Sequence, residues 1–182
     1  MCMNNFPEIE TERLVLTKLK NSDWKMVCFL RSDKEVNKFV DRPGAETKKD
    51  ALAFIHKINT AIENGNSYYW KIRERNNNIM IGSICLWNFT KDQKAAEIGY
   101  DLSPKYQGKG IMQEALKGIL EFGFQQLNLE LIEAYTHYQN ESSKKLLERN
   151  GFKLMKGKED EHNENNIVYE LKKPSANSLQ SP

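Results

Sequence analysis

Cysteine, histidine and long apolar runs are all scarce in this chain of 182 residues. The cysteines are an odd number without CxxC spacing, which argues against a disulfide framework or a zinc site and indicates reduced thiols, at Cys2, Cys28 and Cys85. No apolar stretch approaches the roughly 20 residues of a membrane-spanning helix, and the N-terminus has no apolar run like that of a signal peptide. We therefore expect a soluble cytoplasmic protein with no metal and no membrane partner.

The chain also lacks an excess of charge of one sign, since it has 27 Lys and Arg and 25 Asp and Glu, for a formal net charge of +2. This balance argues against direct nucleic-acid binding, which would show a basic patch or stripe. With 39% hydrophobic residues, the chain can bury a core without disulfides or a structural metal. Residues 9–173 are predicted to form a single domain, and the polar Pro/Ser-rich residues 174–182 a disordered tail.

Hydrophobic periodicity predicts alternating strands and helices. Period-two or β-rich patterns indicate strands over residues 13–19, 68–73, 79–89, 95–102, 129–136, 152–155 and 167–171. Helical spacing and caps indicate a first helix that begins near Trp24. Three more helices are predicted over residues 47–64, 110–127 and 141–149. A mixed sheet flanked by helices follows from this order.

The most informative segment lies between the strand at 95–102 and the helix from residue 110. A short loop with Gly108 and Gly110 leads at once into the helix, and Lys105 and Lys109 add positive charge. The first N–H groups of a helix have no partner, the helix dipole is positive there, and glycines let an anion approach. This loop suits a pyrophosphate, although a plain Gly-rich turn into a helix is the alternative.

Two familiar phosphate-binding motifs do not fit this loop. A dinucleotide fingerprint requires a third glycine where Gln113 stands, and a P-loop requires Lys and Ser or Thr where Ile111 and Met112 stand. The segment Gln107-Gly-Lys-Gly-Ile-Met112 instead resembles the acetyl-CoA pyrophosphate loop of GNAT N-acetyltransferases, Q/R-x-x-G-x-G/A. Gln107 and Gly110 match, whereas Met112 replaces a small residue and could crowd the site unless it turns into the core.

The resemblance extends over nearly the whole chain. Residues 10–16, 96–102 and 140–152 are similar, in that order, to segments of the GNAT branch that acetylates ribosomal-protein N-termini. The resemblance implies an α/β (α+β) fold with a mixed, mostly antiparallel central sheet of about seven strands and about four helices. Its two central parallel strands, residues 97–102 and 131–136, would splay apart to admit the pantetheine arm.

Acetyl-CoA is the cosubstrate that this resemblance implies. The implied cofactor-binding residues are Tyr100, Asp101, Leu102, Gln107, Gly108, Lys109, Gly110, Ile111, Met112, Asn140 and Ser143. Backbone N–H groups freed by a bulge near residues 100–102 would bind the acetyl oxygen. Gly99 is consistent with a bulge, or alternatively with tight packing.

Glu97 and Ser143 are the candidate catalytic residues. Many GNAT enzymes carry a tyrosine acid at the position of Leu147, so Ser143 is the implied donor to the departing sulfur. Glu97 would act as general base, directly or through water. The alternatives are an exposed strand residue for Glu97 and a plain first-turn residue for Ser143. Asn140 could be an N-cap, a pantetheine ligand or both.

The predicted function is direct acetyl transfer, in a ternary complex, to the N-terminal α-amine of a protein, in particular a ribosomal protein. Deprotonating a lysine at pH 7 costs about 4.6 kcal/mol and an α-amine about 1–1.4 kcal/mol, so a weak base serves the α-amine more easily. A small amine (polyamine, antibiotic or amino-acid derivative) and a non-catalytic acyl-CoA sensor are the alternatives. The sequence of the acceptor loops at residues 33–46 and 158–166 does not distinguish among these acceptors. The sequence is compatible with both a monomer and a homodimer.

Overall fold

The computed structural model describes residues 6–174, so Cys2 and residues 175–182 of the predicted tail lie outside the described residues. The strands are β1 (Ile9–Glu10), β2 (Leu14–Lys18), β3 (Tyr68–Glu74), β4 (Gly82–Trp87), β5 (Ala95–Leu102), β6 (Leu131–His137), β7 (Lys153–Glu159) and β8 (Asn166–Lys172). The α-helices are α1 (Trp24–Ser32), α2 (Lys48–Glu63), α3 (Ile111–Glu121) and α4 (Glu141–Arg149). Two short 3-10 turns, η1 (Asn21–Asp23) and η2 (Pro104–Tyr106), precede α1 and α3.

All the described strands form one sheet, in the order β1-β2-β3-β4-β5-β6-β8-β7. Within residues 6–174, only β5 and β6 pair in parallel. This confirms the predicted mixed, mostly antiparallel sheet with four helices. The sheet has eight strands because β1 adds a two-residue edge, too short for an alternating pattern to reveal.

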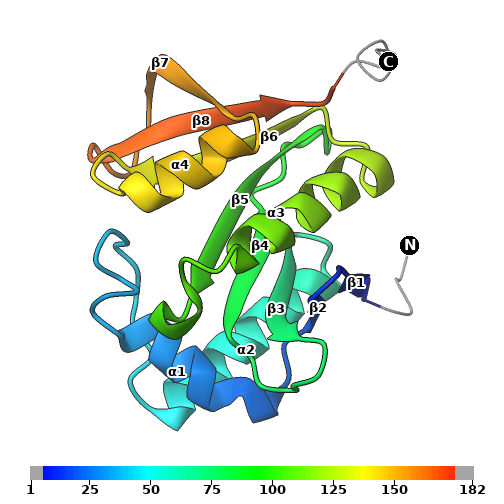
Figure 1. Ribbon diagram of the computed structural model, residues 1–182, viewed down its shortest axis with the longest axis vertical. Helices are drawn as coiled ribbons and strands as arrows, with labels where there is room; N and C mark the ends of the chain where they lie inside the picture. The colour runs from blue at the N-terminus through cyan, green and yellow to red at the C-terminus, as the bar shows by residue number, and fades with distance from the viewer. Residues whose placement is uncertain (1–5, 175–182) are drawn as a thin grey trace.

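β5 and β6 pair only where they begin. Their parallel register runs from Ala95↔Leu131 to Glu97↔Glu133, and no pairing follows along residues 98–102 and 134–137. Each strand keeps its antiparallel neighbour on the other side. The two central strands therefore diverge like a V, as predicted, with Glu97 and Glu133 at its closed end (Figure 1).

The predicted bulge near residues 100–102 is wrong. β5 pairs with β4 in one continuous register from Trp87↔Glu97 to Gly82↔Leu102. Gly99 instead permits close packing, because a Cβ there would lie 3.3 Å from Cys85 Sγ. Backbone groups on the inner edge of β5 are unpaired with a strand because β6 diverges.

Helices cover both faces of the sheet (Figure 1). α3 and α4 pack with the larger hydrophobic core, which includes Trp70 and Ile72 of β3, while α1 and α2 enclose a smaller one. The predicted helix from residue 110 continues past α3 as a π-helical turn, Phe122–Gln126, where Leu127 N donates to Phe122 O. No helix within residues 6–174 is long and apolar enough to cross a membrane.

Candidate active site

The loop between β5 and α3 presents a helix N-terminus without a side-chain cap. Gly110 is the N-cap residue with a φ of +73°, and Gly108 has a φ of +72°. Glu114 N donates to Gly110 O, so the N–H groups of residues 111–113 precede the first hydrogen bond of the helix. A Cβ on Gly108 would meet nothing within 4 Å. This open, positively polarised loop fits the pyrophosphate of acetyl-CoA.

Contacts from the connection between β1 and β2 hold the loop in place. Glu114, in the first turn of α3, accepts hydrogen bonds from Thr11 Oγ1 (2.5 Å), Arg13 N (2.7 Å) and Arg13 Nε (2.6 Å). Arg13 Nη1 also donates to Lys109 O at 3.1 Å. Although burial favours the neutral acid, these hydrogen bonds and the Arg13 charge lower the pKa of Glu114. Sequence reasoning missed this clamp because about a hundred residues separate its two sides.

The other predicted loop residues divide between the surface and the core. Gln107 Nε2 donates to Leu102 O at 3.1 Å and closes the loop. Ile111 and Met112 are buried in the larger core, with 4% and 9% of their surface exposed. Met112 therefore turns into the core, away from the surface of the loop. Lys109 Nζ lies 5.5 Å from the centre of the Tyr106 ring, at the surface of the loop.

Gly108→Ala is expected to weaken acetyl-CoA binding about tenfold, because the added methyl group interferes with a charge-assisted hydrogen bond to phosphate. Gly65 is a matched control, since it has the same φ of +72° and equally open space but follows α2. Gly65→Ala carries the same backbone strain and leaves the affinity unchanged. Isothermal titration calorimetry measures both variants. Equal losses of affinity would attribute the effect to strain rather than to phosphate contact.

The first turn of α4 faces the diverging part of β5. Asn140 is the N-cap, as one interpretation predicted, since its Oδ1 accepts a hydrogen bond from Ser143 N at 3.1 Å. Ser143 Oγ lies 2.8 Å from the Tyr100 hydroxyl of β5. Leu147 is fully buried in the larger core, so an aliphatic side chain fills the position of the family's tyrosine.

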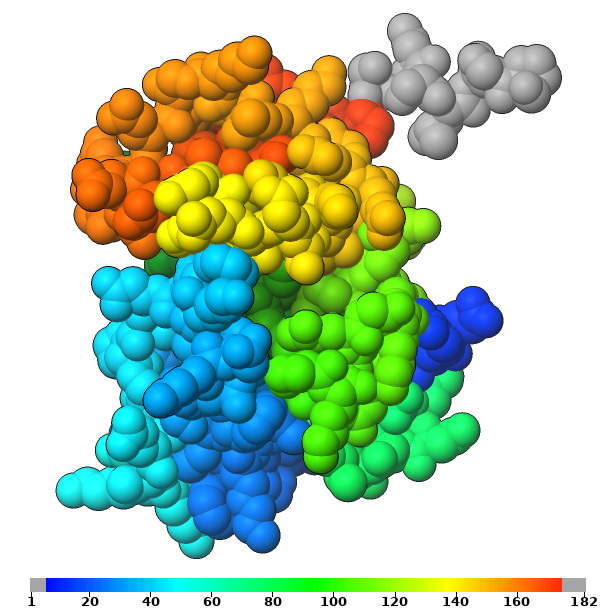
Figure 2. Space-filling model, turned by 60° about the vertical axis from the view of Figure 1, so that its left-hand side comes forward, coloured from blue at the N-terminus to red at the C-terminus, as the bar shows by residue number. Residues whose placement is uncertain are grey.

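The helices beside the opening are tied together by an amide pair that sequence reasoning missed. Gln113 of α3 and Asn150, directly after α4, exchange two side-chain hydrogen bonds of 2.8 and 3.1 Å. This pair fixes the spacing between α3 and α4. Figure 2 shows a hollow where α3 (light green), α4 (yellow) and the segment after α1 (light blue) meet.

Glu97 lies at the closed end of the V and is half-buried. Burial raises the pKa of its carboxyl group, and the nearby carboxylates of Glu133 and Asp160 raise it further. A hydrogen bond from Asn88 Nδ2 and the charge of His162 act in the opposite direction. A carboxylate with a raised pKa, held by one amide, can accept a proton from a neighbouring amine.

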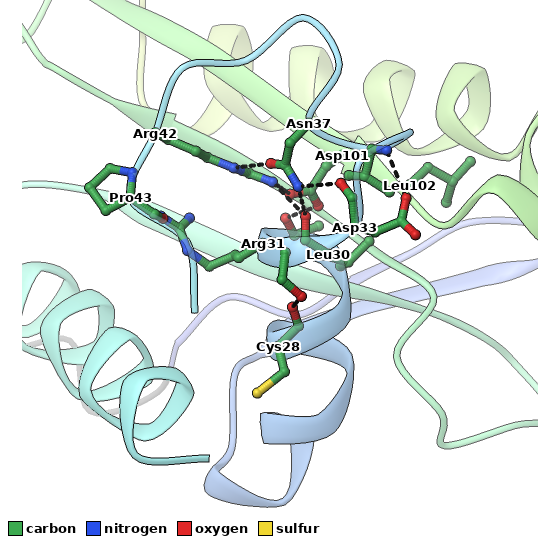
Figure 3. Close-up of polar contacts among 12 residues, drawn as sticks. Cys28, Leu30, Arg31, Asp33, Asn37, Arg42, Pro43, Asp101 and Leu102 are labelled. Atoms are coloured by element: carbon green, nitrogen blue, oxygen red, sulfur yellow. Dashed lines mark hydrogen bonds and ion pairs between the residues drawn. The ribbon is translucent and has the colours of Figure 1, made fainter. Parts of the chain in front are cut away.

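Asp101 and Leu102 differ in the direction of their side chains. Leu102 is buried in the larger core, whereas the Asp101 carboxylate faces the α1–α2 loop, residues 33–47. It accepts hydrogen bonds from Ser83 Oγ (2.6 Å) and Arg42 Nη2 (3.0 Å). Arg42 also donates to Asn37 Oδ1 and to the carbonyl at the end of α1 (Figure 3). The carboxylate thus anchors this loop to β5.

The α1–α2 loop touches both arms of the V. Arg42 holds β5, while the Phe39 ring lies 5.3 Å, centre to centre, from His137 at the end of β6. His137 in turn stacks on Tyr138 at 4.8 Å. The loop therefore bridges the opening on the side of the sheet that carries α1 and α2. The other predicted acceptor loop, residues 158–166, carries Asp160 and His162, whose charges act on Glu97.

Within residues 6–174, no three or more His, Cys, Asp or Glu side chains form a group suited to a metal ion. A mixed sheet split between its parallel strands, with an uncapped helix N-terminus at the mouth of the split, is the arrangement expected of an acyl-CoA-dependent acyltransferase. This class positions a thioester between two strands.

Comparison with known proteins specifies the family. Residues 13–153 match the acetyltransferase (GNAT) domain. The uncharacterized N-acetyltransferase p20 of Bacillus licheniformis is 34% identical over 137 residues, which cover 75% of this chain and 77% of p20. The chain belongs to the GNAT family and is an acetyl-CoA-dependent N-acetyltransferase.

Solved structures share the fold. The ribosomal-protein-S5-alanine acetyltransferase of Vibrio fischeri superposes with a TM-score of 0.79 at 24% identity, covering 93% of this chain and 98% of that one. RimL, a ribosomal L7/L12 α-N-protein acetyltransferase in complex with coenzyme A, superposes with a TM-score of 0.78 at 18% identity, covering 91% and 98%. The predicted likeness to the ribosomal-protein branch is therefore confirmed at the level of fold.

Proposed function

We propose that this enzyme transfers the acetyl group of acetyl-CoA directly to the N-terminal α-amine of a protein. The V between β5 and β6 carries the proposal, because the anion-binding loop lies at its mouth and Glu97 at its closed end. Residues 98–102 of β5 have no strand partner on the β6 side, which leaves their backbone free to bind the pantetheine arm and the thioester.

Binding and activation of the thioester involve the backbone first. The uncapped N–H groups at the start of α3 bind the pyrophosphate, assisted by Lys109. Inner-edge backbone N–H groups of β5, near Tyr100–Leu102, donate to the acetyl oxygen as negative charge develops on it. Asn140 both caps α4 and borders the arm. The residues of this chain thereby hold the carbonyl carbon for attack from the acceptor side.

Glu97 removes the proton of the acceptor amine, directly or through a water molecule. The amine nitrogen forms a bond to the carbonyl carbon, the carbon–sulfur bond breaks, and the electron pair leaves on sulfur as the CoA thiolate. Ser143 stabilises that thiolate with a hydrogen bond. An α-amine needs only about 1–1.4 kcal/mol to lose its proton at pH 7, which suits a single carboxylate.

Two features favour a protein α-amine as the acceptor. The low pKa of an α-amine suits the single carboxylate of Glu97, whose charge, with that of the nearby Asp160, attracts a cationic amine. The two similar structures, the Vibrio fischeri acetyltransferase and RimL, have names that specify ribosomal-protein acceptors. A ribosomal protein is therefore the acceptor that we propose first.

Transfer of a labelled acetyl group tests this proposal. Acetyl-CoA labelled in its acetyl group is incubated with the enzyme and a cell extract separated into macromolecules and small-molecule filtrate, each with an enzyme-free control. We expect label at protein N-termini, located by mass spectrometry. Label only in the filtrate would show a small-amine acetyltransferase instead. Acetyl-CoA binding without transfer to either fraction would indicate a non-catalytic sensor.

A further inference from the structure

Tyr100 and Ser143 place two hydroxyl groups against each other across the opening. Tyr100 lies in the part of β5 that has separated from β6, and Ser143 lies in the first turn of α4. Their oxygens are 2.8 Å apart, and only 8% of Ser143 is exposed. This contact joins the two sides of the cleft that the pantetheine arm enters under the proposed function.

Either hydroxyl group can be the donor in this hydrogen bond. A phenol, with an ordinary pKa of about 10, is a better donor than an aliphatic hydroxyl. When Tyr100 donates to Ser143 Oγ, the Ser143 proton is available for another acceptor. Asn140 Oδ1 accepts a hydrogen bond from the Ser143 N–H group, which fixes the backbone of Ser143 but does not orient its hydroxyl group. The contact with Tyr100 restrains the rotation of that hydroxyl group.

We propose that Tyr100 is a positioning residue that directs the Ser143 hydroxyl proton toward the departing CoA sulfur. This inference rests on the proposed function. When the carbon–sulfur bond breaks, the electron pair stays on sulfur, Ser143 O–H donates to the thiolate, and Tyr100 O–H donates to Ser143 Oγ. Such a chain of two hydroxyl groups polarises along its length, which strengthens the bond to sulfur.

Neither hydroxyl gives up its proton in this arrangement. Burial raises the pKa of Tyr100 to about 12. An alkyl thiol such as that of cysteine has a pKa of about 8.5, so a thiolate is too weak a base to deprotonate this phenol. The pair acts by hydrogen bonding, and the thiolate later takes its proton from solvent.

The test combines Tyr100→Phe, Ser143→Ala and the double variant with a matched control. Tyr169→Phe is that control, because it also removes a buried tyrosine hydroxyl that donates at 2.9 Å to a partner on α4, Glu148, and the proposed hydrogen-bond chain does not include that contact. Steady-state kinetics give kcat and KM with an acceptor identified by acetyl labelling. Calorimetric titration with CoA and with acetyl-CoA, over a pH range that spans the ionisation of the CoA thiol, requires no acceptor.

We expect Tyr100→Phe to lower kcat about tenfold with little change in KM, and Tyr169→Phe to leave both unchanged. At high pH, Tyr100→Phe should weaken CoA binding about tenfold while acetyl-CoA affinity stays the same, since only the thiolate is a strong acceptor. Adding Tyr100→Phe to Ser143→Ala should have no further effect.

Additive losses in the double variant, or a Tyr100→Phe variant whose kcat and thiolate binding match the wild type, would overturn the proposal. An equal loss of CoA and acetyl-CoA affinity would assign Tyr100 to packing and overturn it too. The CoA titration separates this inference from the proposed function. If the wild type transfers acetyl to no protein, thiolate binding still shows whether the hydroxyl pair recognises sulfur.

Discussion

Glu97→Gln is expected to lower kcat/KM about 100-fold, because it removes the general base while keeping the size and the hydrogen bond of the side chain. Burial first, and then Glu133 and Asp160, raise the pKa of Glu97. Because Glu97 takes the proton of the acceptor ammonium, the wild-type reaction needs an ionised carboxyl group and a protonated amine, so the acid limb of log kcat/KM follows the pKa of Glu97. In the variant the amine must lose its proton to solvent first, so the acid limb should move to higher pH, toward the α-amine pKa of about 7.7–8.0.

Glu97→Gln should lower activity but raise the stability of the folded protein. A carboxyl group whose pKa is raised by folding binds more protons in the folded than in the unfolded state, so its ionisation costs stability as pH rises through that interval. At pH 7 the cost is present in the wild type and absent from Glu97→Gln. The variant should therefore be less active but slightly more stable in thermal unfolding, which a folding defect would not produce.

Two further variants check the assignment. Glu133→Gln removes a charge that raises the pKa of Glu97, so the acid limb of the profile should move to lower pH. Glu63→Gln removes an exposed carboxylate on α2 and should leave the profile unchanged. If Glu97→Gln retained wild-type kcat/KM and an unchanged profile, Glu97 would not be the base.

Local patterns in the sequence account for most elements of this fold. The strand at 95–102 and the helix at 141–149 were predicted with the bounds that the structure gives, because alternation and an Asn cap are short-range signals. β7, predicted to end at residue 155, extends to Glu159 through a charged segment with no apolar alternation. The π-helical turn after α3 likewise depends on packing, since Gly123 lies against side chains of Ile132 and Leu129.

The contacts that hold the site could not be predicted in this way. Glu114 binds Arg13, Arg42 binds Asp101, and each pair joins segments far apart in the chain. Such polar pairs have no period and depend on how the elements pack. The Tyr100–Ser143 contact is of the same kind: both residues were predicted from motifs, but only the fold shows that their hydroxyl groups meet.

The largest effect on stability is expected at a buried ion pair between η1, the turn before α1, and the sheet. Lys71 Nζ of β3 lies 2.9 and 3.0 Å from the two carboxylate oxygens of Asp23, and the side chains are only 8% and 7% exposed. Asp23→Ala leaves the ammonium group buried without its partner. The free energy of unfolding should fall by about 3–5 kcal/mol, measured by denaturant-induced unfolding followed by circular dichroism.

Two controls separate burial from charge. Glu10→Ala breaks the exposed pair with Arg75 and should cost less than about 1 kcal/mol. The double variant Asp23→Ala/Lys71→Met removes both charges and should recover most of the loss, because no buried charge then remains unpaired. A single-variant loss below about 1 kcal/mol would mean that water reaches Lys71 when its partner is absent.

This pair also connects stability to the site. Asp23 immediately precedes α1, whose C-terminal end starts the α1–α2 loop that holds Asp101 and contacts His137. An Asp23→Ala protein that remains folded at low temperature should therefore lose acceptor affinity before acetyl-CoA affinity, because the anion-binding loop is held separately by Glu114 and Arg13. Parallel losses of both affinities, by calorimetry and kinetics, would contradict this separation.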